Sequence, residues 1–139
     1  ALAKHFGEQL MDAATRRSDI RCISIRPSWV QWEGNYERNL GPGLRDPDEP
    51  SASFWSYIDA RDVGTAYRAA LEGTSSGHEV CLIAAADTRA KRGLRELMAE
   101  FYDGYDRFAS DYEDPRSAFD CAKMKALFGW TPSYSWREH

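Results

Sequence analysis

Two short apolar runs with a helical pattern between them limit the folds open to this chain. Residues 21–26 and 78–84 are rich in β-branched and other apolar side chains, and a proline closes the first run. Such runs are typical of strands that are covered on both faces, as in parallel sheets. Between them, residues 59–72 have apolar side chains at helical spacing, with Asp59 as the expected N-cap and Gly73 as the expected stop. The alternation predicts an α/β fold.

Three more segments have the apolar periodicity of helices: residues 2–17, 89–102 and 120–128. Residues 27–56 keep no period and contain several glycines, prolines and aromatic side chains, so we expect a ligand-binding loop with one short helix. Residues 54–58 are aromatic and apolar and suggest a further short strand. Two or three strands make a poor sheet alone, so the chain is expected to belong to a larger sheet.

Composition excludes several classes of function. The 139 residues are 42% hydrophobic and 29% charged, which is typical of one globular domain. The net charge is −4 and no basic patch stands out, so nucleic acid is not an expected partner. No apolar run approaches the roughly 18 residues of a membrane span, so no membrane partner is expected. The cysteines are three and far apart, which favours a cytoplasmic setting and no metal site.

The first helix carries a motif. Residues 1–8 read Ala-Leu-Ala-Lys-His-Phe-Gly-Glu. The lysine followed by Gly-Glu resembles the active-site helix of the extended short-chain dehydrogenase/reductases, the NAD-dependent epimerase/dehydratase family. That helix carries Tyr-x-x-x-Lys, and its tyrosine would fall one residue before Ala1. The resemblance implies that Lys4 is catalytic, binds the ribose hydroxyls of NAD or NADP and lowers the pKa of that tyrosine. The alternative for Lys4 is a surface ion pair with Glu8.

Four later segments resemble the same family, in the same order. Residues 26–30 read Arg-Pro-Ser-Trp-Val and resemble the segment whose backbone passes under the nicotinamide. Residues 57–63 resemble Tyr-Ile-His-Val-x-Asp-Val, with aspartate in place of the histidine, and residues 79–85 resemble the strand Tyr-Asn-Ile-Gly. Residues 119–132 resemble the closing signature Asp-x-x-Lys-Ala…Leu-Gly-Trp-x-Pro. The resemblance implies cofactor contacts by Lys4, Pro27, Ser28, Trp29 and Val30.

The resemblance also implies a division of the chain. Residues 1–30 and 57–85 would form the carboxyl-terminal part of a Rossmann-like, doubly wound parallel sheet that binds the dinucleotide. Residues 31–56 and 86–139 would form a small α/β substrate-binding region. As in the family, residues 2–17 would make a homodimer through their apolar face.

Two departures from the family bear on the substrate. Trp29 stands where many nucleotide-sugar members of the family have asparagine. Trp55 stands where those members have an arginine that binds the pyrophosphate. An indole can stack on a sugar but carries no charge. A sugar, a sugar acid or a sterol-like substrate is therefore favoured over a nucleotide diphosphate sugar. Trp29, Trp55 and Arg116 are the candidate substrate contacts, and the alternative for Arg116, which the sequence favours, is an exposed loop arginine.

The function implied is that of an NAD(P)-dependent epimerase/dehydratase or dehydrogenase acting on a sugar-like alcohol. A tyrosinate would remove the hydroxyl proton while hydride passes to the nicotinamide. The 139 residues contain neither that tyrosine nor a Gly-rich phosphate loop, so this chain by itself is expected to be inactive and to bind no NAD measurably. The alternative is a non-catalytic binding or scaffold module with the same half-fold. The aromatic loop would then be a protein-contact surface.

Overall fold

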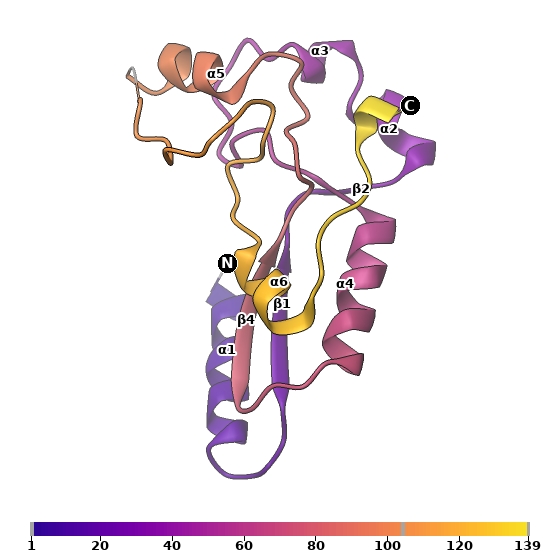
Figure 1. The fold of residues 1–139 in the computed structure, drawn as a ribbon, viewed down its shortest axis with the longest axis vertical. Helices are drawn as coiled ribbons and strands as arrows, with labels where there is room; N and C mark the ends of the chain where they lie inside the picture. The colour runs from indigo at the N-terminus through magenta and orange to yellow at the C-terminus, as the bar shows by residue number, and fades with distance from the viewer. Residues whose placement is uncertain (1, 104, 139) are drawn as a thin grey trace.

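Helices and short strands alternate along the chain (Figure 1). The computed structural model describes residues 2–103 and 105–138, so Ala1, residue 104 and His139, which the predicted domain ranges include, lie outside it. The elements in chain order are α1 (Leu2–Thr15), β1 (Cys22–Pro27), β2 (Val30–Gln31), the 3₁₀ helix η1 (Glu33–Asn35), α2 (Tyr36–Asn39), α3 (Pro42–Arg45), β3 (Ile58–Asp59), α4 (Ala60–Glu72), β4 (His78–Ile83), α5 (Leu94–Phe101), α6 (Ala122–Phe128) and the 3₁₀ helix η2 (Trp136–Glu138).

The strands pair in parallel. β1 lies beside β4 with Cys22 opposite His78 and Pro27 opposite Ile83, and the chain passes through α4 between them. β2 and β3 form a second, two-residue parallel pair. The fold is therefore mixed α/β with short parallel strands, which confirms the predicted class at that level.

The strand predicted at residues 54–58 is wrong in most of its length. Residues 52–55 form a turn, and only Ile58 continues into β3. Phe54 and Trp55 have φ angles of 49° and 54°, in the left-handed region, where no extended strand lies. Sequence periodicity does not reveal such backbone angles in aromatic residues.

Helices cover both faces of the β1–β4 pair. On one face Ser24 of β1 lies against Met11 of α1. On the other face the apolar side chains of both strands pack against α4 and α6, and Figure 1 shows the pair of strands between α1 and α4. Alternate side chains of a strand point to opposite faces of the sheet. One set of side chains therefore packs against α1, and the other set packs against α4 and α6. This main core comprises Ile58, Ala66, Ala70, Cys81, Ile83, Met124 and Trp130.

α1 turns Glu8, Met11 and Asp12 to the sheet and a row of apolar side chains to the outside. None of its 14 residues is buried. Leu2, Phe6 and Leu10 recur one turn apart and are exposed, Phe6 at 62% of its surface. The predicted helix 2–17 ends two residues early, at Thr15, whose hydroxyl donates to the Asp12 carbonyl oxygen.

The closing segment of the chain packs against α4. α6 ends at Gly129, which has a φ of 67° and lies in the left-handed region favoured by glycine. Trp130 is buried, and its Nε1 donates to Thr65 Oγ1 of α4 at 3.0 Å. The Asp62 carboxylate, in the first turn of α4, accepts from the backbone N–H groups of residues 133 and 134 at 2.9 and 3.0 Å.

Distant residues move other boundaries. The helix predicted at residues 89–102 begins only at Leu94, whose N–H donates to the Asp114 carboxylate at 2.6 Å. That cap comes from 20 residues further along the chain, so a local pattern cannot reveal it. The caps of α4 are as predicted, with the Asp59 carboxylate accepting from the Arg61 N–H and Gly73 at the end. Residues 27–56 contain η1, α2 and α3, more helix than expected.

Candidate functional site

The amino end of α1 lies at the carboxyl edge of the β1–β4 pair. α1 runs antiparallel to β1 (Figure 1), and its Glu8 accepts from Arg26, near the end of β1, at 2.7 Å from Nε and 2.5 Å from Nη2. Asp12, one turn later, meets His78 at the start of β4. Lys4 precedes Glu8 by one turn on the same face, so it lies past the end of β1. Ligands of parallel α/β sheets bind at this edge.

Lys4 is exposed, and it does not pair with Glu8 in the described structure, because Glu8 is held by Arg26. That hydrogen-bonded pair lowers the pKa of the Glu8 carboxyl. The ion pair with Glu8, which was the alternative role for Lys4, is thus replaced by a Glu8–Arg26 pair that fixes α1 against the sheet edge.

Residues 27–30 lie at the same edge. The Ser28 N–H donates to the Ile83 carbonyl oxygen at 2.9 Å, and the Ser28 hydroxyl donates to Ser56 Oγ at 2.9 Å. The Trp29 carbonyl oxygen accepts from the Ile58 N–H at 3.0 Å. The backbone after Pro27 is therefore tied to β3 and β4, while the Trp29 side chain stays 42% exposed and Val30 is also exposed. The predicted cofactor residues thus share one edge with Lys4.

Trp55, a predicted substrate contact, is a core residue. Its ring is completely buried and packs at 5.9 Å from Phe101 and 6.0 Å from Tyr102, measured between ring centroids. The Phe54 ring next to it also contacts Tyr102, at 5.5 Å between centroids. The Trp55 ring is closed to solvent and packs against α5, so it offers no surface on which a sugar could stack.

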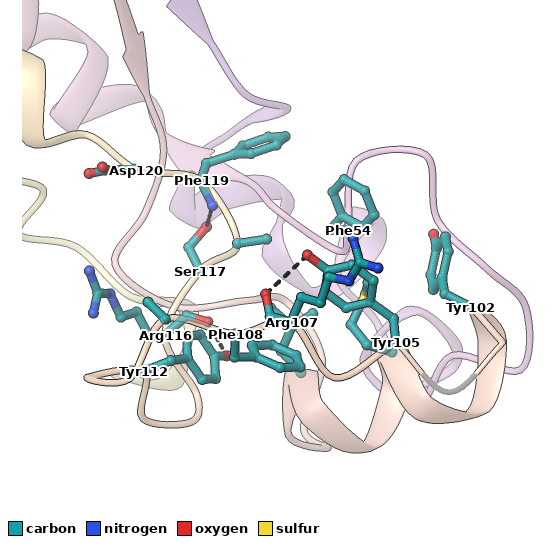
Figure 2. A pocket seen from close by; sticks show the side chains of 14 residues that line it. Phe54, Tyr102, Tyr105, Arg107, Phe108, Tyr112, Arg116, Ser117, Phe119 and Asp120 are labelled. Carbon is teal, nitrogen blue, oxygen red and sulfur yellow. Dashed lines mark hydrogen bonds between the residues drawn. The ribbon is translucent and has the colours of Figure 1, made fainter.

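A cavity of about 490 Å³ opens between α5 and residues 105–120 (Figure 2). Arg116, the third predicted substrate residue, lines it, and Trp29 and Trp55 do not. Sequence reasoning missed the cavity walls, although residues 101–119 contain a dense run of aromatic side chains that signals them. The lining rings are Phe54, Tyr102, Tyr105, Phe108, Tyr112 and Phe119.

The aromatic walls are held by ring contacts and by one hydrogen-bonded hydroxyl. Phe108 lies 4.7 Å from Tyr112 and 5.9 Å from Tyr105, between ring centroids. The Arg95 guanidinium stacks on Phe108 at 4.5 Å. The Tyr112 hydroxyl donates to the Asp114 carboxylate at 2.9 Å, and burial together with that carboxylate raises the pKa of Tyr112. The phenol is therefore neutral at physiological pH and serves as a hydrogen-bond donor.

Ser24, His78 and Asp12 form a hydrogen-bonded row with the order of a hydrolase triad. Ser24 Oγ lies 2.7 Å from His78 Nε2, and His78 Nδ1 lies 2.7 Å from Asp12 Oδ1. Acyl transfer also needs donors aimed at an oxyanion beside an accessible nucleophile. Ser24 is in the middle of β1 with Met11 Sδ 3.2 Å away, and the His78 side chain is only 3% exposed. This row therefore fastens α1 to the sheet.

Asp59 joins the start of α4 to the loop after β2. It is buried, and its carboxylate accepts from the Arg61 side chain at 2.8 and 3.0 Å and from the Tyr36 hydroxyl. Burial alone would raise the pKa of Asp59, but the hydrogen bonds from Arg61 and Tyr36 outweigh it and lower the pKa. The Arg61 guanidinium also stacks on Tyr134 at 3.9 Å, so this cluster ties the closing segment to α4.

Within residues 2–103 and 105–138, no three His, Cys, Asp or Glu side chains come close enough to hold a metal ion. In the same part of the chain, no helix combines the length and apolar character needed to cross a bilayer. Neither the models of known protein families nor the curated proteins contain a match to this chain. A proposal of function therefore rests on the placement of residues, because a mixed α/β fold alone supports many activities.

Proposed function

We propose that this chain is the carboxyl-terminal part of an NAD(P)-dependent epimerase/dehydratase or dehydrogenase that acts on a sugar-like substrate. The observation that supports the proposal is the Glu8–Arg26 pair, which holds the amino-terminal half of α1, the part that carries Lys4, at the carboxyl edge of β1, where the anchored segment 27–30 begins. In this reading β1 and β4 belong to a larger Rossmann-like sheet, and the isolated 139-residue chain is inactive.

The residues at this edge fit a nicotinamide nucleotide. Lys4 offers an exposed ammonium, and residues 27–30 offer a backbone fixed to β3 and β4. NAD or NADP would supply the hydride acceptor there. Lys4 would donate hydrogen bonds to ribose hydroxyls, and its charge would favour the phenolate of a tyrosine one helical turn earlier. That phenolate would take the proton from the substrate hydroxyl.

The exposed Trp29 supports a sugar-like substrate, because an indole face can stack on the C–H face of a sugar. Arg116 lines the aromatic cavity and provides a second contact in the proposal. Trp55 is not a proposed substrate contact, because its ring is buried in the core.

The outer face of α1 supports a homodimer. Leu2, Phe6 and Leu10 form an exposed apolar stripe on the side of the helix away from Glu8 and Asp12, which face the sheet. A second copy of the chain, bringing the same stripe, would bury both, as two-fold interfaces do.

A binding or scaffold module remains the second candidate. The exposed indoles of Trp29 and Trp32, the latter 55% exposed, are the observation that favours it. Tryptophan is enriched among the side chains that dominate protein interfaces. The two candidates differ in what precedes α1 and in whether Lys4 affects any reaction.

The test uses the protein extended by the residues encoded upstream of Ala1. The enzyme proposal expects a tyrosine immediately before Ala1 and NAD(P)-dependent oxidation of at least one sugar-like alcohol. Lys4→Met should lower kcat by about 100-fold or more, since general-base catalysis contributes on that order. Lys125→Met, on the exposed side of α6, is the matched control and should leave kcat unchanged. The scaffold alternative expects another residue before Ala1 and no turnover.

A further inference from the structure

We propose that the aromatic cavity between α5 and residues 105–120 binds a ligand in which a carboxylate is joined to a ring with an apolar face. The identification of this cavity as the substrate site of the enzyme rests on the proposed function. The proposal that the cavity binds such a ligand depends only on the residues that line it. The observations that carry it are the ring-lined walls and one cavity arginine whose charge has no partner in the described chain.

The walls favour a flat apolar surface. Phe54 and Phe119 meet edge to face at 6.4 Å between centroids, and Phe54 lies 5.5 Å from Tyr102. The Phe108 and Tyr112 rings, which contact each other, also line the cavity. Aromatic faces attract other rings and the C–H faces of saturated rings, because both bury apolar area against a π surface. A cavity of about 490 Å³ has the size of a small-molecule site.

Two backbone positions at this wall have left-handed angles. Phe54 has a φ of 49° and Asp103, next to Tyr102, has a φ of 50°. Left-handed angles in residues other than glycine cost on the order of 1–3 kcal/mol each and are concentrated at functional sites. Phe54 lines the cavity, while its neighbour Trp55 is completely buried in the core cluster behind it. The Phe54 ring thus lies in the cavity at a cost to the fold.

The charges of the lining favour an anion. Arg116 donates to Asp111 at 3.3 Å, and the Asp120 carboxylate accepts from the Ala122 N–H at 2.7 Å. Within residues 2–103 and 105–138, no carboxylate pairs with the guanidinium of Arg107. In Figure 2 the Arg107 side chain extends toward Phe54, whereas the Arg116 side chain extends away from it. An arginine in a ring-lined cavity can bind a carboxylate with two parallel hydrogen bonds.

Two sources offer this chemistry: an aromatic acid, and a sugar acid whose pyranose presents a C–H face. Titration calorimetry of the 139-residue chain with naphthoate and with glucuronate distinguishes them. Naphthylmethanol and glucose are the matched neutral ligands. We expect one acid to bind at least about tenfold more tightly than its neutral counterpart, as a hydrogen-bonded charge pair would give. Tighter binding of naphthoate indicates the aromatic source, and tighter binding of glucuronate indicates the sugar acid.

Variants tie the binding to the cavity. Arg107→Gln should weaken the preferred acid about tenfold and leave its neutral counterpart unchanged. Arg68→Gln, at an exposed arginine of α4 that pairs with Glu72, is the matched control and should bind as the unmodified chain does. Ala118→Trp places a large ring at an exposed lining position and should abolish binding of both ligands.

The proposal is overturned if neither acid binds, if the neutral ligands bind as tightly, or if Arg107→Gln and Ala118→Trp leave the affinity unchanged. No nicotinamide cofactor is present in these titrations. Failure here therefore leaves the proposed redox reaction standing, and loss of that reaction leaves the binding result standing.

Discussion

Asp62 holds the closing segment of the chain as a single buried acceptor. Its carboxylate accepts from the backbone N–H groups of residues 133 and 134, 71 and 72 positions away. Asp62→Ala leaves both donors without this partner and should lower the free energy of unfolding by about 2 kcal/mol. Urea unfolding measures the loss as a lower midpoint with an unchanged m value. Asp19→Ala, at an exposed aspartate, should change nothing, and an equal loss in both variants would contradict this role.

Asp59 makes the stability of the fold depend on pH in the acid range. Its pKa is lowered in the folded chain, where bonds from Arg61 and Tyr36 outweigh the effect of burial. The stabilisation is complete above the ordinary aspartate pKa of about 3.9 and is lost as pH falls through the lower folded pKa, because the unfolded chain then binds more protons. The stability gap between the unmodified chain and Asp59→Asn should therefore shrink between about pH 5 and pH 2. Thermal unfolding across that range measures it, and a constant gap would refute it.

At the scale of elements, two glycines should respond to the same substitution with opposite signs. Gly129 ends α6 with a φ of 67°, whereas Gly64 is exposed within α4 and has open space where a Cβ would be. Gly129→Ala should cost about 1 kcal/mol, since alanine is strained in that conformation. Gly64→Ala should stabilise by about 0.5–1 kcal/mol, because alanine favours a helix interior. Denaturant midpoints of the two variants on opposite sides of the unmodified chain confirm both assignments, and shifts of the same sign contradict them.

Periodicity was a good guide to elements whose signals are local. The strands 22–27 and 78–83 and the caps of α4 lie within a residue or so of their predicted positions, since apolar spacing and Asp59 determine them nearby. α5 begins late because its cap is Asp114. Residues 52–55 turn because two aromatic residues adopt left-handed angles. Both effects depend on contacts that form only in the folded chain.

The sequence suggested some residues of the candidate site and missed others. Lys4 and residues 27–30 were proposed from motifs, and the Glu8–Arg26 pair holds the amino-terminal half of α1 at the strand edge where residues 27–30 begin. Trp55 was expected to face a ligand, but burial among α5 side chains makes it core. Most of the cavity rings lie close together in residues 102–119, where they follow no helical or strand period, and Phe54 is brought to them only by the fold.

For the whole molecule, α1 presents an apolar stripe of the kind that a dimer covers. Phe6→Glu places a charge in the middle of that stripe and should convert a dimer to a monomer, because a buried unpaired charge costs far more than the apolar contact it replaces. Tyr67→Glu, at an exposed aromatic of α4, is the matched control and should remain dimeric. Sedimentation equilibrium distinguishes these outcomes, and a chain that is monomeric throughout would remove the proposed interface.

The central claim is that Lys4, beyond the carboxyl edge of β1, binds a nicotinamide nucleotide. The most direct measurement is the affinity for NAD and NADP, by calorimetry, of the protein extended by its upstream-encoded residues. We predict saturable binding of one of them, weakened at least about tenfold by Lys4→Met and unchanged by Lys125→Met. Absence of binding, or equal affinity in the unmodified protein and Lys4→Met, would contradict the claim.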